Sequence, residues 1–212
     1  MEFSTEFPGP GPDDYANVLA LNTAFLEASS ELKGPQRGRL AAAPFLLFSI
    51  RENDLDWWER ALADGRQGDL MAAPELNDIE LRGIQSAAIG FLWQLARRNP
   101  YAARVISGAT IAWCEKLISF PLVTLLDRVG ARSDLMKSRL DDQEDSGHRL
   151  LGAGTSSSSR VRHSSHLVVL QSLLTRTGSE QYIRLPAAAC RMARPRLKIA
   201  ERKMTRIRRK KV

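Results

Sequence analysis

Cysteine is scarce in this chain of 212 residues, which holds only Cys114 and Cys190, far apart in sequence. Secreted domains that depend on disulfides carry more cysteines at regular spacings. The sequence therefore argues against a disulfide framework and predicts a reducing, cytoplasmic location. The first twelve residues contain neither a basic stretch nor an apolar stretch, so we expect no signal peptide.

Long apolar runs are also missing. The longest run, Leu40 to Ile50, has 11 residues and is interrupted by Pro44 and Ser49. A transmembrane helix needs about 20 predominantly apolar residues, so we expect no transmembrane segment. Tyrosine is rare, whereas Leu and Ala are abundant. Unbranched side chains favour helix over sheet, and the composition therefore predicts an all-α fold.

Residue patterns typical of catalysis or metal binding are absent as well. There is no Gly-x-Ser-x-Gly nucleophile turn and no Cys-x-x-Cys pair, and the glycines at 152 and 154 are not followed by the Lys of a phosphate-binding loop. His163 and His166 lie three residues apart, with Cys190 as a third candidate ligand, but we expect solvent-exposed histidines rather than zinc. We predict no catalytic residue, no metal and no cofactor. The second alternative to the leading functional hypothesis below is an enzyme with an unrecognised site.

Apolar residues at spacings of three and four predict a series of helices. Asp13 or Asp14 is expected to cap the first helix, with its end at Lys33-Gly34-Pro35. A second helical segment is expected over 36–50, kinked at Pro44. Later caps are predicted at Asn53 or Asp54, at Asn77 and at Thr110, with helix starts at Pro100 and Leu122 and a stop at Gly108.

These elements predict a compact helical, bundle-like domain at the N-terminal side, a polar linker and a basic, partly disordered C-terminal segment. The expected boundaries are a flexible arm over 1–12, the helical domain over 13–137, the linker over 138–164, an accessory helix within 165–192 and a basic tail over 193–212. The helical domain is expected to bury most of its four tryptophans, with one of the adjacent Trp57 and Trp58 free to point outward.

Charge is divided unevenly along the chain. Residues 1–145 carry 15 Lys and Arg against 22 Asp and Glu, whereas residues 146–212 carry 16 against 2. A segment this basic favours a polyanionic partner, and it neutralises nucleic-acid phosphates in a salt-dependent way. The predicted nucleic-acid-binding residues are the tail cations Arg194, Arg196, Lys198, Arg202, Lys203, Arg206, Arg208, Arg209, Lys210 and Lys211.

The leading hypothesis is a non-enzymatic helical regulatory or adaptor protein whose tail contacts nucleic acid with little sequence preference. The first alternative is a protein-interaction module that binds a partner through an apolar helical groove. Trp57 and Trp58 are the predicted partner-binding residues, on condition that one of them is exposed. Under this alternative the tail serves solubility or attachment to an anionic surface. A helix-turn-helix over 101–117 is a weaker candidate, because its second helix offers few donors to base edges. The sequence does not indicate an oligomeric state.

Overall fold

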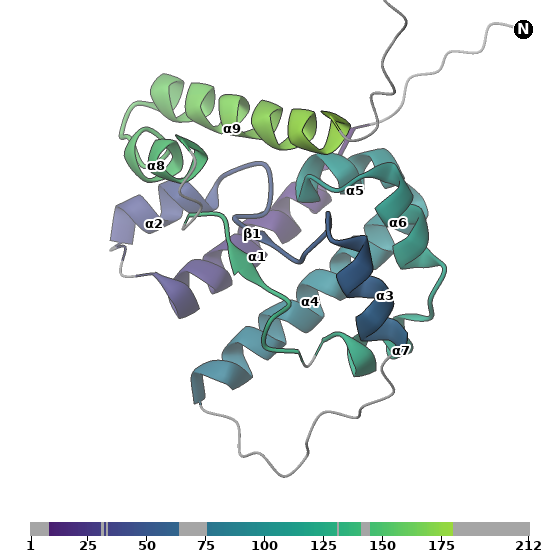
Figure 1. Cartoon of the computed structure of the whole chain (residues 1–212). Coiled ribbons are helices and arrows are strands. Elements are labelled where there is room, and N and C mark those ends of the chain that lie inside the picture. The colour runs from purple at the N-terminus through teal and green to yellow at the C-terminus, as the bar shows by residue number, and fades with distance from the viewer. Residues whose placement is uncertain are drawn as a thin grey trace, which may run out of the picture. The chain divides into compact units, whose positions relative to one another are not determined.

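The computed structural model describes residues 9–30, 32, 34–63, 76–130, 132–140 and 145–179 (Figure 1). The described residues form nine helices and one two-stranded antiparallel sheet, which confirms the expected all-α class. In chain order the elements are α1 (Pro12–Ser29), α2 (Gly34–Ala41), β1 (Phe48–Ser49), α3 (Leu55–Ala63), α4 (Leu76–Arg98), α5 (Pro100–Ser107), α6 (Ile111–Ile118), α7 (Leu122–Arg128), β2 (Lys137–Ser138), α8 (Asp145–Gly152) and α9 (Ser159–Ser179).

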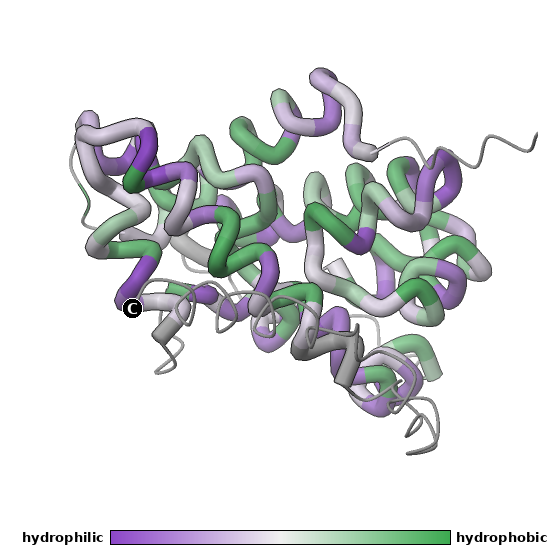
Figure 2. Tube along the Cα trace, turned by 90° about the horizontal axis from the view of Figure 1, so that it is seen from above, coloured by the Kyte–Doolittle hydropathy of each residue, from purple (hydrophilic) through white to green (hydrophobic). Residues whose placement is uncertain are grey.

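Helix α4 is the central element, and it packs against α1, α5, α6 and α7. Ala88, Ile89, Leu92, Leu95 and Ala96 are buried along it, because it meets neighbours around much of its circumference. Figure 2 shows hydrophilic and hydrophobic stretches alternating along the helices, as expected for helices with one face in a core. No helix of the described residues combines the length and the apolar character needed to cross a membrane.

The predicted helix start at Pro100, the stop at Gly108 and the cap Thr110 are confirmed, whereas the cap of α5, Asn99, was not predicted. Asn99 caps α5, and its side chain accepts a hydrogen bond from the amide of Ala102 at 3.0 Å. Gly108 ends α5 with a φ of 73°, a conformation that favours glycine. Thr110 then caps α6 by accepting a hydrogen bond from the amide of Trp113 at 3.0 Å.

Three other predicted boundaries differ from the structure. Helix α1 begins at Pro12 with Gly11 as its N-cap, and Asp14 lies inside the first turn, where its carboxylate accepts a hydrogen bond from the Gly11 amide at 2.8 Å. The same helix ends at Ser29, and Gly34, expected beyond its end, opens α2 instead. Helix α4 begins at Leu76, one residue before the predicted cap Asn77.

The predicted second helix over 36–50 is correct only as far as Ala41. Beyond it the chain passes through turns and bends over residues 42–47 and becomes extended at β1. Asn22 of α1 is fully buried and replaces the missing helical partners. Its amide donates to the carbonyls of Ala41 at 3.2 Å and Phe45 at 2.9 Å, and its carbonyl accepts from the amide of Leu47 at 2.9 Å. Side-chain bonds from a distant helix thus outweigh the local helical pattern.

A buried ion pair fixes the far end of this segment. Arg139, directly after β2, is 7% exposed and lies 2.5 Å from the carboxylate of Glu52, which is 3% exposed. The guanidinium also donates to the carbonyl of Leu46 at 2.9 Å and to that of Ser107. The Arg139 side chain therefore connects the two-stranded sheet of β1 and β2 with the end of α5.

The predicted linker over 138–164 contains β2's last residue, α8 and the start of α9. Leu150 of α8 is fully buried, and Gly154 and Thr155, which follow α8 within the same range, are buried too. The accessory helix predicted within 165–192 corresponds to α9, which starts earlier, at Ser159, and residues 180–192 lie outside the described residues. Val169 is 2% exposed, so α9 packs on the helical body rather than standing apart, and one compact unit extends to Gly178.

Candidate functional site

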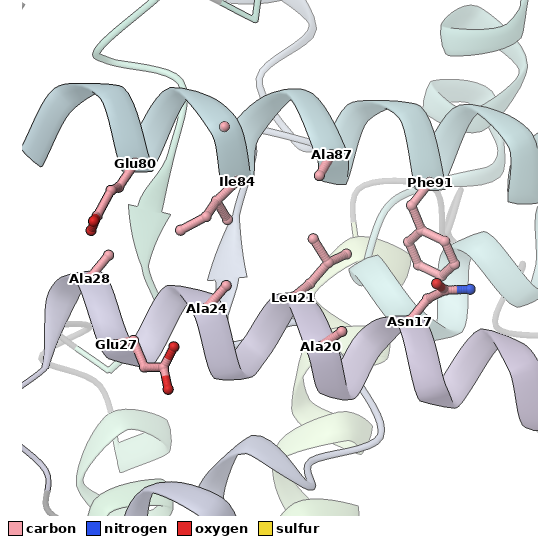
Figure 3. A pocket seen from close by; sticks show the side chains of 11 residues that line it. Asn17, Ala20, Leu21, Ala24, Glu27, Ala28, Glu80, Ile84, Ala87 and Phe91 are labelled. Atoms are coloured by element: carbon pink, nitrogen blue, oxygen red, sulfur yellow. The ribbon is translucent and has the colours of Figure 1, made fainter.

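An open apolar groove lies between α1 and α4, which run antiparallel at this point (Figure 3). It has a volume of about 770 Å³. Residues 17–28 of α1 and 80–91 of α4 supply its walls. The lining residues are Asn17, Ala20, Leu21, Ala24, Glu27, Ala28, Glu80, Gly83, Ile84, Ala87 and Phe91.

Small residues create the hollow. Ala20, Ala24 and Ala28 follow one another at intervals of four along α1, and Gly83 and Ala87 do the same along α4, so each series occupies one face of its helix. A Cβ atom added at Gly83 would meet nothing within 4 Å. The two helix surfaces therefore leave room for the side chains of a third helix.

The floor of the groove is apolar and one of its ends is acidic. Leu21 and Ile84 are each 8% exposed and form the floor together with the partly buried Phe91. Glu27 and Glu80 lie where α1 ends and α4 begins. No Lys or Arg is among the described residues that line the groove, but Arg37 of α2 forms an ion pair with Glu27 at 3.8 Å from outside the groove. The arrangement suits binding of an apolar surface with a cation at one end.

The adjacent tryptophans do not offer an exposed docking surface. Trp57 is 6% and Trp58 is 2% exposed, and their rings meet edge to face with centroids 5.6 Å apart. The indole nitrogen of Trp57 donates to Asp134 at 2.7 Å. Partner binding by this pair was predicted only if one tryptophan is exposed, and neither is exposed.

Helices α5 and α6 form the hairpin that the sequence suggested as a helix-turn-helix, but α6 faces the core. Trp113, Cys114 and Leu117 are buried at 1%, 0% and 3% exposure. Burial raises the pKa of Cys114 to about 12, so its thiol stays protonated. The opposite face of α6 is exposed at Ala112 and Glu115, which offer no donor to base edges, and the glutamate would be repelled by phosphates.

The histidines divide into two environments. His148 and His163 are exposed as expected, whereas His166 is 4% exposed and its ring packs edge to face against Phe45. Burial lowers the pKa of His166, and Arg162 and His163 lower it further. No group of three metal-ligating side chains occurs among the described residues. Cys190 lies outside them.

The basic tail residues at 194–211, predicted to bind nucleic acid, lie outside the described residues, as do acidic residues 141–144. Sequence reasoning missed the α1–α4 groove, although its signal is visible: small residues recur every fourth position on two amphipathic helices. No family model, no curated protein and no solved structure matches the chain.

Proposed function

We propose that this protein is a non-enzymatic interaction module that binds an amphipathic helix of a partner protein in the α1–α4 groove. The observation that carries the proposal is an open apolar groove, walled by small residues and bounded by Glu27 and Glu80 at one end. Helix-in-groove recognition uses such surfaces, with apolar anchors of the partner at helical spacing.

The dimensions of the groove set the length of the partner helix. Residues 17–28 and 80–91 span equal stretches of α1 and α4, each about 16 Å at the helical rise per residue. This length corresponds to about three helical turns. The partner needs three or four apolar anchors along one stripe, facing Leu21, Ile84 and Phe91.

The two glutamates set the charge of the partner. Both residues lie at the same end of the groove, where Glu80 points toward α1 and Glu27 points away from α4 (Figure 3), and no cation lines the groove within the described residues. A Lys or Arg at one end of the partner helix therefore fits, and an acidic residue there is disfavoured. Because both glutamates are exposed, the contribution is screened by salt.

The test uses a labelled peptide of about three turns, with Leu at helical spacing and Lys at one end. Gly83→Leu in the full chain should abolish binding of this peptide in fluorescence anisotropy, because the new side chain fills the hollow. Gly90→Leu is the matched control, since Gly90 lies in the same helix, has open space at its Cβ and does not line the groove. A scrambled peptide that binds equally well would contradict the proposal.

A charge variant tests the orientation of the partner. Glu27→Gln with Glu80→Gln should weaken peptide binding about tenfold at low salt and less at high salt. Glu115→Gln with Asp127→Asn removes the same charge from exposed positions outside the groove and should leave affinity unchanged. Equal losses of peptide affinity in both double variants would show that binding depends on the net charge of the protein and not on the position of the two glutamates.

A second candidate function is nucleic-acid contact through the basic tail, supported by 16 Lys and Arg against 2 acids over residues 146–212. Replacing Arg202, Lys203, Arg206, Arg208 and Arg209 by Gln in the full chain should weaken binding to DNA or RNA and flatten its salt dependence. If a non-nucleic polyanion binds the unaltered chain equally well, nucleic acid is not the specific partner.

A further inference from the structure

A second cleft, distinct from the α1–α4 groove, lies between α9, the start of α1 and the residues after α2. It consists of two hollows that both use Ala42 and His163 and therefore adjoin. The apolar hollow has a volume of about 570 Å³, and its walls include Tyr15, Leu19, Leu167 and Leu170. Volumes of this size are typical of sites for small molecules.

The apolar hollow leaves large hydrophobic side chains in contact with solvent. Tyr15, Leu19 and Leu167 are 40%, 45% and 47% exposed, and they come from two helices that are far apart in sequence. Single exposed apolar residues are ordinary, but a cluster around a hollow indicates a binding surface. Pro44, which also lines it, stiffens the chain on the third side.

The adjoining basic hollow, of about 490 Å³, is formed by the first turns of α9. Arg160, Arg162 and His163 line it, and no Asp or Glu is among the described residues that line either hollow. The first amides of a helix have no partner within the helix and carry partial positive charge, which favours an anion there. Arg162 is partly committed, since it donates to the carbonyl of Ser156 at 2.9 Å.

We propose that this cleft binds a single-chain anionic amphiphile, such as an alkyl phosphate or a fatty acid. The head group lies against Arg160 and His163 at the start of α9, and the alkyl chain lies along Leu19, Leu167 and Leu170. A cationic end joined directly to an apolar hollow matches a ligand that has one charged end and one apolar end. The basic hollow alone would bind only the charged end of such a ligand, and the apolar hollow alone would bind only its alkyl chain.

The experiment titrates the full chain with dodecyl phosphate below its micelle concentration, by calorimetry. Inorganic phosphate supplies the head group alone, and dodecyl maltoside supplies the same chain on a neutral head. The proposal expects dodecyl phosphate to bind at least tenfold more tightly than either. Inorganic phosphate binding as well as dodecyl phosphate, or maltoside binding equally, would overturn it.

Paired variants locate the ligand. Arg160→Gln with His163→Gln should weaken dodecyl phosphate binding about tenfold, the equivalent of one lost charge-assisted contact, whereas Arg149→Gln on α8, outside both hollows, should not. Leu19→Gln should likewise weaken binding, and Leu151→Gln, equally an exposed leucine, should not. Circular dichroism checks that each variant is folded. Equal losses of dodecyl phosphate affinity at lining and control positions would overturn the proposal.

Discussion

At the scale of single residues, the pair of Arg139 and Glu52 shows how a charge can be held inside a small helical core. Each oxygen of the Glu52 carboxylate is used, one by Arg139 and the other by the Ser49 hydroxyl at 2.7 Å and the Ile50 amide at 2.9 Å. Removal of one partner leaves the other charge buried without compensation, which is far costlier than loss of an exposed ion pair.

We therefore expect Arg139→Met to lower the free energy of unfolding by about 3–5 kcal/mol, measured by urea denaturation. The double variant Arg139→Met with Glu52→Gln should recover part of this loss, because the uncompensated carboxylate is gone. As a control, Lys116→Met removes a cation from the more exposed pair with Glu59 and should cost about 1 kcal/mol or less. Strictly additive single effects of Arg139 and Glu52 would contradict this account.

His166 should make the folded state sensitive to acid. Burial, Arg162 and His163 lower the pKa of His166 below its usual value of 6.5 in the folded protein. Below that value the unfolded chain binds a proton that the folded protein binds less readily, so the free energy of unfolding falls as pH falls. His166→Gln should flatten this decline between pH 6.5 and 5 in thermal melts, whereas the exposed His148→Gln should not. Identical profiles for both variants would contradict the assignment.

At the scale of elements, the segment between α2 and β1 is held by hydrogen bonds from other elements, and Asn22 makes the largest number of them. Asn22 of α1 donates to the carbonyls of Ala41, at the end of α2, and of Ala43 and Phe45, and it accepts a hydrogen bond from the amide of Leu47. Asn22→Leu keeps the size of the side chain but removes every one of these hydrogen bonds.

We expect Asn22→Leu to destabilise the fold by about 3 kcal/mol or more, since each unsatisfied buried group costs about 1–3 kcal/mol. Amide hydrogen exchange should accelerate first at Leu47, whose amide loses its acceptor. The matched control is Asn17→Leu, the same substitution at an exposed position of the same helix, which should change stability by about 0.5 kcal/mol or less. Equal effects of the two variants would show that the segment does not depend on the Asn22 hydrogen bonds.

The helix ends that were predicted correctly depend on neighbouring residues, whereas the segments that were predicted wrongly depend on residues far away along the chain. Gly108 and Thr110 act on backbone groups within three or four residues, so their roles follow from the sequence. The path of residues 42–50 depends on Asn22 and Arg139, which lie far away along the chain, and the local pattern therefore predicted a helix. Composition likewise suggested a linker over 138–164, where packing of Leu150 instead stabilises α8.

At the scale of the whole chain, the candidate site was predictable only in part. Helical periodicity shows that α1 and α4 each have an apolar face, but not that they lie side by side with small residues opposed. The division of charge is visible in the sequence alone, whereas an acidic groove end and a basic cleft become apparent only when α1, α4 and α9 are placed. The described unit thus presents two surfaces of different chemistry.

Binding of a partner helix between α1 and α4 is the central claim, and nuclear magnetic resonance of the full chain tests it most directly. The isotope-labelled protein is titrated with the Leu- and Lys-containing peptide, and amide shifts are followed. We predict that the largest changes fall within residues 17–28 and 80–91 and disappear in Gly83→Leu but not in Gly90→Leu. Changes centred on other elements, or none at all, would contradict the claim.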